Sequence, residues 1–522
     1  MRNFWCVIFD VLIFAALFMQ KDVFAAEPIV FNGDSIDKQY FNSEVVFQQT
    51  LYVCGKYSNG YGRWLYLSYE RVRDPEEVAI PGTAAYDSVI AVLPNQMLVA
   101  YCPDAQTSGI RLGATFNDLV ATVTAHHSIT IYGELHPDNN TRPTSRPDVG
   151  DARLIICNTN LEYFCAEWQG TYGAASDEQF ARQSIKTGKA LANIGADIYA
   201  FEEMQQGDSS LRCLTNLLNA RTAPGRYRYV DDGDTAESIY SKVGFIYRAD
   251  KVQPVLELGH PYTNNILYVF NEYVQAFEEI ETGERFVLCV NHFASKYGDT
   301  SYAYATSNSV RMSNVKHLVE FLNQKLEDNY YDDEDILIVG DLNCNTMEEP
   351  ILYLDSVGYI SQMKRFSEDD YSYVYNNEVS YLDHAFASPS LNGQITGAAP
   401  YHINADENGS LAYKYGTDTS MYRYSDHDPL IIGLKLESEG GGQQQGNDST
   451  NVSEVAAEQQ LFISGTYGRL TIRSETAADV VVYDLAGREI AAQARVSQFE
   501  IALPKGVYIV RFGKSGRKVV VQ

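Results

Sequence analysis

The chain has 522 residues, of which 45% are hydrophobic and 12% aromatic; this excludes a disordered protein and leaves room for several domains. Its 68 acidic residues outnumber 40 basic ones, and the formal charge of -28 excludes a protein that grips polyanions tightly through an overall basic surface. The charge still permits a soluble, exported enzyme that binds a polyanion weakly through a local basic patch or bound cations.

An export signal is predicted at the N-terminus. Arg2 precedes an apolar run over 4–19, and a Val-Phe-Ala triplet ends at Ala25, a small residue of the kind after which such signals are cleaved. The run is short and contains Asp10, which favours cleavage over a membrane anchor. We therefore expect 1–25 to be a signal peptide. The mature chain would be secreted or held at the cell surface, via the periplasm, without stable insertion into a membrane.

Seven cysteines remain after the predicted signal is removed. An oxidising compartment permits disulfides, and the candidate pairs are Cys54–Cys102 and Cys165–Cys213. Cys157 and Cys289 lie inside apolar runs, which indicates buried free thiols. No Cys/His spacing indicates a zinc site.

Residues 27–145 are predicted to form a small all-β domain, a barrel or a sandwich. Turn residues separate the short runs VVFQQTLYV, WLYLSYERV, DSVIAVLP, MLVAYC, ATVTA and SITIYGEL. The stretch 136–150 is rich in Pro, Asn and Arg and has no periodicity, so it is predicted to be a linker.

Residues 151–437 are predicted to form an α/β domain, with sheets covered by helices. Ser176 and Gln179 form a capping box before one helix, Gly195 ends it, and an apolar stripe predicts a second helix over 309–327. The strands are continuous apolar runs of the kind buried on both faces. They are LII, IYAF, VGFIY, VLCV, ILIV and LIIGLKL. A Gly/Gln/Ser-rich linker over 438–460 and a β-rich module over 461–522 follow.

Several strands of 151–437 end or begin at polar residues that apolar packing would not select. One acidic strand end is usually a solvated turn or a helix cap. Six such ends in one domain indicate a functional rim, because strands of a sandwich bring their ends to a common edge where functional loops gather. The residues are Asn160, Glu162, Glu202, Glu203, Asn291, His292, Asp341, Asn343, Asp383, His384, Asp426 and His427.

The residue types at these strand ends fit one reaction. The oxygen atoms of Asn160, Glu162 and Glu203 suit Mg²⁺, Mn²⁺ or Ca²⁺ rather than zinc. A cation held in this way neutralises a phosphate oxygen. A histidine paired with a carboxylate, here His427 with Asp383, takes a proton from water or stabilises a crowded phosphorus centre.

Water is the expected nucleophile. Asp341 and Asn343 can hold the phosphate or the attacking water molecule. No motif for a Ser, Cys or Lys nucleophile is present, so direct attack by water is the simplest mechanism.

These segments, in this order, resemble the endonuclease/exonuclease/phosphatase superfamily, which includes deoxyribonuclease I and the abasic-site endonucleases, over roughly 150–437. ADIYAFEEM is similar to the family's metal-binding glutamate segment and NHFASK to its histidine strand, while GDLN and SDHDP are the most specific pieces. GDLNCNTMEEPI, YSYVY, YLDHAF and HINADE are closer still to bacterial extracellular nucleases with an N-terminal OB-like domain. The resemblance implies a four-layered α/β sandwich flanked by two small all-β domains, and hydrolysis of phosphate esters by in-line attack of water.

Carried over residue by residue, the resemblance implies two groups of side chains in one site. The metal-binding residues would be Asn160, Glu162, Glu203 and Asp426. The catalytic residues would be His292, Asp341, Asn343, Asp383 and His427, with Asp341 and Asn343 orienting water and phosphate and Asp383 supporting His427.

Two positions depart from the family's pattern. Glu202 stands where a glutamine is usual and adds negative charge to the rim, and Asn271 falls near a usual arginine, which puts one phosphate contact in doubt. Lys296, Arg311 and Arg423 are candidate substrate-binding replacements, although such residues are more often plain surface charges.

The C-terminal module, 461–522, resembles the sorting domain of type IX secretion through VVVYDLAGREI and LPKGVYIVRFGKSGRKVVVQ. The resemblance implies that the secretion machinery is a partner. The alternative is a generic immunoglobulin-like adhesion domain.

The sequence therefore predicts a secreted phosphodiesterase that depends on Mg²⁺, Mn²⁺ or Ca²⁺, namely a nonspecific extracellular endonuclease acting on DNA, with RNA left open as a second substrate. One alternative is a phosphatase or phosphodiesterase of lipid or sugar phosphates. Another, from a different class, is a catalytically silent secreted binding protein. The oligomeric state is not indicated.

Overall fold

The computed structural model describes residues 29–31, 36–167, 172–233, 241–261, 272–296, 306–331, 333–437, 461–466, 469–484, 488–504, 506–512 and 515–521. The chain divides into two compact units, Met1–Gly441 and Gly442–Gln522, and each is described by itself. The predicted signal peptide at 1–25, the predicted linker at 438–460 and Asn271 lie outside the described residues.

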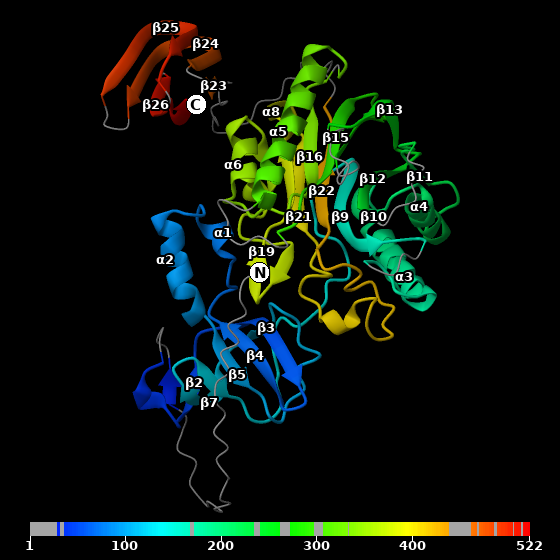
Figure 1. Cartoon of the computed structure of the whole chain (residues 1–522), viewed down its shortest axis with the longest axis vertical. Coiled ribbons are helices and arrows are strands. Elements are labelled where there is room, and N and C mark those ends of the chain that lie inside the picture. The colour runs from blue at the N-terminus through cyan, green and yellow to red at the C-terminus, as the bar shows by residue number, and fades with distance from the viewer. Residues whose placement is uncertain are drawn as a thin grey trace, which may run out of the picture. The chain divides into compact units, whose positions relative to one another are not determined.

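The first unit begins with an eight-stranded sheet in the order β1-β2-β7-β8-β5-β4-β3-β6 (Figure 1). The consecutive strands β2 and β3 lie near the two ends of this order and are separated by three residues, so the sheet curls into a small barrel. Strands β5 and β8 run parallel in it. The bounds are β1 (Ile29–Phe31), β2 (Glu44–Phe47), β3 (Leu51–Asn59), β4 (Gly62–Ser68), β5 (Leu98–Tyr101), β6 (Thr115–Phe116), β7 (Leu119–Ala125) and β8 (Ser128–Thr130).

The barrel encloses its own apolar core, and it also carries two helices that the all-β expectation missed. Val45, Leu65 and Ala100 are among its fully buried core residues. The run DSVIAVLP was expected in a strand but lies mostly in α2 (Ala84–Val92), preceded by the short α1 (Pro75–Val78). The helix forms because the Thr83 side chain caps the amide of Tyr86, and two alanines start the first turn.

The larger part of the first unit contains two six-stranded sheets. The first has the order β11-β12-β10-β9-β22-β21. Its strands are β9 (Leu154–Phe164), β10 (Ile198–Gln205), β11 (Tyr227–Tyr229), β12 (Ser241–Arg248), β21 (Ile395–Pro400) and β22 (Leu430–Leu434). The second has the order β13-β14-β15-β16-β20-β17. Its strands are β13 (Val252–Gly259), β14 (Glu272–Glu279), β15 (Arg285–His292), β16 (Ile336–Asp341), β17 (Ile360–Ser361) and β20 (Asp383–Ala387).

The two sheets pack face to face with helices on both outer faces. One core joins residues of both sheets, such as Ile156 and Val339. The outer face of the first sheet packs on α3 (Asp177–Ile194) and α4 (Ser209–Arg221), and that of the second on α5 (Thr306–Glu327) and α6 (Glu349–Ser356). This is a four-layered α/β sandwich, which confirms the expected fold class. The remaining elements are α7 (Gln362–Phe366), α8 (Pro389–Asn392) and the hairpin β18 (Tyr373–Tyr375) and β19 (Glu378–Ser380).

Both predicted helices are present. In α3 the Ser176 hydroxyl accepts from the Gln179 amide at 3.3 Å, and Gly195 ends the helix in the left-handed conformation, at φ 61°. The Gln179 side chain accepts from the amide of Ala175 rather than that of Ser176, so the capping box is shifted by one residue on that side. The second helix, α5, begins three residues earlier than predicted.

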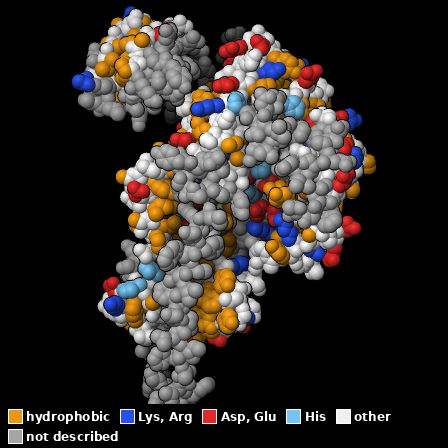
Figure 2. Space-filling view, viewed as in Figure 1, with side chains coloured by type: hydrophobic (Ala, Val, Ile, Leu, Met, Phe, Trp, Pro, Cys, Tyr) orange, Lys and Arg blue, Asp and Glu red, His pale blue; other side chains and the backbone are white. Residues whose placement is uncertain are grey.

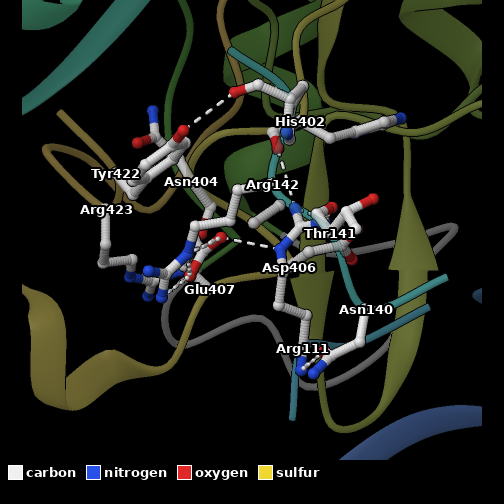
Figure 3. A network of polar contacts seen from close by, with 12 residues as sticks. Arg111, Asn140, Thr141, Arg142, His402, Asn404, Asp406, Glu407, Tyr422 and Arg423 are labelled. Atoms are coloured by element: carbon white, nitrogen blue, oxygen red, sulfur yellow. Dashed lines mark hydrogen bonds and ion pairs between the residues drawn. The ribbon is translucent and has the colours of Figure 1, made fainter. Parts of the chain in front are cut away.

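Buried ion pairs join the barrel to the sandwich. Arg111 of the barrel lies 2.7 Å from Glu407 and also donates to the carbonyl oxygen of His402 at 2.9 Å (Figure 3). Arg142, in the segment between barrel and sandwich, lies 2.8 Å from the other carboxylate oxygen of Glu407. Removing one partner of the buried Arg111–Glu407 pair costs about 3–5 kcal/mol, whereas the half-exposed Arg142 contributes less. The pairs therefore hold the loop over 402–407 against the barrel.

None of the seven described cysteines forms a disulfide, so the two candidate pairs are wrong. Cys54 lies at a bulge of β3 beside Leu67, whereas the Cys102 amide bonds the carbonyl of Arg63, four residues away along β4. Four strand residues span about 13 Å. Bridged cysteines need Cα atoms within about 7 Å. Cys157 and Cys289 are buried free thiols, as predicted.

The second unit is a β-rich module. Its strands are β23 (Leu461–Thr466), β24 (Arg469–Asp484), β25 (Glu489–Ala502), β26 (Gly506–Phe512) and β27 (Ser515–Val521). They form one five-stranded sheet in which β24 pairs with β23, β25 and β26 around a small apolar core. In the part of the chain that is described, no helix has both the length and the apolar character needed to cross a membrane.

Glu77, at the junction of barrel and sandwich, is expected to make stability depend on pH. Its carboxylate accepts from the amides of Tyr381 (2.7 Å) and Thr346 (3.3 Å), and burial raises its pKa from 4.5 to about 7. The folded state thus keeps a proton that the unfolded chain loses, so this contribution to stability is complete below pH 4.5. It should fall by up to about 3 kcal/mol as pH rises to 7.

Melting curves between pH 4.5 and 8 test this expectation. Glu77→Gln should lose that component of the pH dependence, while the exposed Glu44→Gln should keep the wild-type profile. Identical profiles for Glu77→Gln and wild type would contradict the assignment.

Candidate active site

The strand directions bring the predicted rim residues to one edge of the sandwich. The parallel strands β9 and β10 end at this edge, as do the parallel strands β15 and β16. The antiparallel strand β20 begins there, and His427 lies three residues before β22, which also runs antiparallel. His292, Asp341 and Asp383 are direct register partners on β15, β16 and β20. Acidic, basic and histidine side chains lie close together in this part of the surface (Figure 2).

Asp341, the last residue of β16 in the second sheet, lies at the centre of this edge and contacts a residue of the first sheet. One of its carboxylate oxygens accepts from the Asn343 amide at 2.9 Å, and the other accepts from the Asn160 side chain at 3.1 Å. The second oxygen also lies 3.7 Å from Nε2 of His292 and 3.8 Å from Nε2 of His427. Asp341 therefore connects an asparagine of the first sheet with two imidazoles.

His427 is held by a buried carboxylate. Its Nδ1 lies 2.8 Å from Asp383, and its ring packs against that of Tyr373, with the ring centroids 4.6 Å apart. The contact with Asp383 fixes the ring and leaves Nε2 directed at Asp341. This is the histidine–carboxylate pair expected from the sequence.

Glu203, His292 and Asp341 form a group that could hold a metal ion. Each offers one ligand atom, and these atoms lie within 4.8 Å of one another. No Lys or Arg among the described residues pairs with Glu203 or Asp341. A buried and a half-buried carboxylate with one imidazole and no Lys or Arg partner are a donor set that fits a divalent cation. His292, expected in a catalytic role, thus lies among the candidate ligands.

Burial and like charge shift the titration of these groups. Burial is the largest cause that raises the pKa of Glu203 to about 8, and the negative charge of Asp426 is the next largest. Burial also raises the pKa of Asp341, while His427 and His292 oppose that rise. Burial alone would lower the pKa of His427, but Asp383 and Asp341 raise it well above its usual value. The site therefore holds excess negative charge that a cation would relieve.

Unusual backbone geometry supports the site. Glu162, Glu203 and Asn343 have positive φ angles of 49°, 54° and 49°, a conformation that side chains other than glycine rarely adopt. Gly340, before Asp341, has φ 150°, and a Cβ there would lie 2.0 Å from the carbonyl oxygen of Asn291. Such strained residues persist where the surrounding structure holds them, and they concentrate at functional sites.

The other predicted residues differ in their positions. Glu162 is tied to Lys414, whose amino group lies 3.0 Å from its carboxylate, and Asp426 is close enough to raise the pKa of both Glu162 and Glu203. Arg423 lies near the same rim, because it lowers the pKa of Glu162.

Lys296 and Arg311 do not lie free at the site. Lys296 pairs with Glu76 of the barrel at 3.1 Å and with Glu348 at 2.5 Å. Arg311 is 1% exposed and donates to the carbonyl oxygen of Ala294. Both side chains are engaged within the protein, so they are poorly placed for the substrate contact expected of them.

Two side chains at the site were missed by sequence reasoning. Lys414 stands in the loop after β21, where no periodicity or motif distinguishes it. Tyr373 lies in the YSYVY segment that was noted only for its resemblance. The alternation of this segment could have predicted a short strand that contains Tyr373. It could not have predicted that the Tyr373 ring contacts His427.

Comparisons with known proteins give structural likeness only. No protein-family model matches the chain, and no curated protein matches it. An endonuclease/exonuclease/phosphatase from Bacteroides vulgatus is 13% identical and covers 54% of this chain and 99% of its own, with a TM-score of 0.39. A mannosyl-6-phosphatase from Bacteroides thetaiotaomicron is 18% identical (54% and 100% covered, TM-score 0.36). The catalytic domain of human Nocturnin is 13% identical (53% and 93% covered, TM-score 0.37).

Metal binding at Glu203 should be visible as stabilisation. A cation that binds only the folded state raises the melting temperature, and we expect this with Mn²⁺ or Mg²⁺ for the wild-type chain. Glu203→Gln should lose most of this gain. Because burial raises the pKa of Glu203 to about 8, folding at neutral pH must protonate it, and the neutral glutamine should therefore also raise the melting temperature measured in chelator at pH 7.

Thermal scans in chelator and in a series of metal concentrations measure both effects. Glu320→Gln, an exposed position on α5, is the matched control and should respond as wild type does. An unchanged metal response in Glu203→Gln would show that the ion binds elsewhere.

Proposed function

We propose that this protein is a divalent-metal-dependent phosphodiesterase and, more specifically, an extracellular nuclease. The observation that carries the proposal is the meeting, around Asp341, of a candidate metal group with the His427–Asp383 pair. A metal group alone fits many proteins, and so does a histidine–carboxylate pair. Their convergence on one carboxylate suits attack by water on a phosphate ester.

The residues divide into those that hold the cation and those that handle the proton. Glu203, His292 and Asp341 would hold the ion, with Asn160 ordering Asp341 from the first sheet. When bound, the cation supplies positive charge that neutralises a phosphate oxygen. The Asp341 carboxylate, which faces both imidazoles, would accept the proton of the attacking water molecule.

His427 would stabilise the phosphate group during attack. Its raised pKa keeps the imidazole protonated near neutral pH, so its Nε2–H can donate to a phosphate oxygen that gains charge. Asp383 fixes the ring through Nδ1. As water attacks, the bond from phosphorus to the new oxygen forms while the bond to the leaving oxygen breaks, and the leaving group departs with a proton from solvent or from His427.

The barrel supports a nucleic-acid substrate in preference to a small phosphate ester. We propose that it is an OB-like domain. A first strand divided into β2 and β3 pairs with β7 at one end and with β4 at the other, and β5 runs parallel to β8. Domains with this strand order bind oligonucleotides and oligosaccharides on one face.

We also propose that the protein is exported, with 1–25 as its signal peptide and 461–522 as a type IX secretion sorting domain. The N-terminal apolar run and the C-terminal β-rich module support this proposal. The charge of -28 is suited to a protein that stays soluble outside the cell.

The catalytic proposal predicts that the purified chain nicks plasmid DNA and hydrolyses bis(p-nitrophenyl) phosphate with Mg²⁺ or Mn²⁺, and does neither in chelator. His427→Ala and Asp383→Asn should each lower kcat about 10²- to 10⁴-fold, because they remove the donor or leave it misoriented.

Initial rates on both substrates measure these effects. His317→Ala, on α5, is the matched histidine control and should keep wild-type rates. Full activity in His427→Ala would refute the role given to the pair, and activity on the small ester with cleavage of neither plasmid nor single-stranded DNA or RNA would refute the nuclease while leaving the phosphodiesterase.

A further inference from the structure

A row of aromatic side chains crosses three strands of the barrel. Tyr57 on β3 is the register partner of Trp64 on β4, and Trp64 is the register partner of Tyr101 on β5. The ring centroids are 5.8 Å apart for Tyr57 and Trp64 and 5.5 Å for Trp64 and Tyr101, with interplanar angles of 36° and 37°. We call these three residues the aromatic row. The rings form one continuous apolar surface.

The aromatic row faces outward from the barrel. Leu65 and Leu67 alternate with Trp64 along β4 and are fully buried, so Trp64 lies on the opposite face of the strand. Tyr57 is 53% exposed, although a tyrosine ring of this size is usually better covered. Hydrophobic side chains gather over the surface of β3 to β5 (Figure 2).

A glycine gives the rings room to lie along the sheet. A Cβ atom at Gly62 would lie 2.7 Å from the Tyr101 ring and 2.9 Å from the Trp64 ring. Both rings therefore occupy space that a side chain at this position would take. Strand β4 thus carries both Trp64 and, two residues earlier, Gly62. The absence of a side chain at Gly62 leaves the space that the Trp64 and Tyr101 rings occupy.

The β18–β19 hairpin links the aromatic row to the candidate active site. At one end of β18 the Tyr373 ring packs on His427. At the other end the Asn377 side chain fills the space where a Cβ of Gly55 would stand. Gly55 precedes Tyr57 by two residues on the same face of β3. Tyr373 begins β18, and Asn377 lies in the turn that joins β18 to β19.

Tyr375 adds an exposed ring between the two ends of the hairpin. It lies two residues after Tyr373, so both side chains lie on one face of β18. Its exposed fraction is 59%. Aromatic side chains therefore extend from His427 along the hairpin to the barrel.

The charge of this surface suits a polyanion. The strands β3, β4 and β5 contain no acidic residue, in a chain whose net charge is -28, and their basic residues Lys56 and Arg63 alternate with the row and lie on the opposite face. A phosphate backbone lying along these strands would meet no carboxylate from them. Stacking rather than ion pairing would then supply most of the affinity.

We propose that the aromatic row is a binding site for unpaired bases of a single-stranded polynucleotide, and that it holds the strand whose backbone enters the catalytic rim. The proposal rests on the proposed phosphodiesterase function and names its substrate. Stacking of bases on aromatic rings tolerates any sequence, and duplex DNA has no free base faces to offer. A polysaccharide also stacks on aromatic rings, but it would not lead from the row to a phosphate-hydrolysing site.

The test uses the full chain with His427→Ala to prevent cleavage and a fluorescein-labelled 15-nucleotide thymidine strand as the probe. Anisotropy should show binding of this strand, with weaker binding of the matching duplex and no competition by a neutral oligosaccharide.

Trp64→Leu and Tyr101→Leu should each weaken single-strand binding at least about fivefold. Gly62→Ala, which keeps both rings but displaces them, should also weaken it. Phe366→Ala, an exposed aromatic residue outside the barrel, should not.

The intrinsic fluorescence of Trp64 gives a direct readout. In a background with both Trp5→Phe and Trp168→Phe, the single strand should quench tryptophan emission, because stacked bases contact the Trp64 indole. Circular dichroism and melting temperatures confirm that each variant is folded.

Kinetics of the otherwise wild-type enzyme separate this proposal from the proposed function. The row variants should raise KM for the 15-nucleotide strand with little change in kcat, and should leave hydrolysis of bis(p-nitrophenyl) phosphate unchanged. Hydrolysis of the small ester with unaltered single-strand binding in Trp64→Leu, Tyr101→Leu and Gly62→Ala would overturn the aromatic site and leave the phosphodiesterase. If the chain hydrolyses no phosphate ester but these variants lose single-strand binding, the proposed phosphodiesterase function is overturned and the aromatic site remains. Competition by the oligosaccharide would overturn the choice of ligand.

Discussion

The burial of several carboxylates at the seam between two sheets is the constraint on which the site depends. Glu202, Asp341 and Asp383 are at most 1% exposed, and Glu203 lies beside them. Such a group of like charges is stable only with protons, imidazoles, amide donors or a cation in its midst. His427 and Asn160 supply part of this compensation. A bound divalent ion would complete it, so the charges that destabilise the rim would favour a cation there.

The rest of the molecule holds this rim in place. Strained backbone at Glu203 and Asn343 aims their side chains, and Gly340 allows β15 and β16 to approach closely. Arg111 of the barrel pairs with Glu407 and donates to the carbonyl oxygen of His402, and these contacts hold the loop over 402–407 against the barrel (Figure 3). The barrel is therefore part of the structure that supports the site, and it also offers a surface along which a long substrate can extend.

Sequence reasoning found what depends on local pattern and missed what depends on distant partners. The ends of α3 followed from Ser176 and Gly195, and the strand-end residues converged because strand direction alone places them on one edge. Lys296 was expected at the substrate, but its partner Glu76 is 220 residues away, and no local pattern reveals such a pair. The α2 helix was missed because an apolar run of its length fits either a strand or a helix.

The measurement that tests the central claim most directly is a comparison of wild type with Asp341→Asn for Mn²⁺ binding and phosphodiester hydrolysis in the same preparation. Asp341 connects the candidate metal group to His427, so replacing its carboxylate by an amide of equal size should weaken Mn²⁺ binding and abolish hydrolysis together. Asp341→Asn that binds Mn²⁺ and hydrolyses the diester as wild type does would contradict the account.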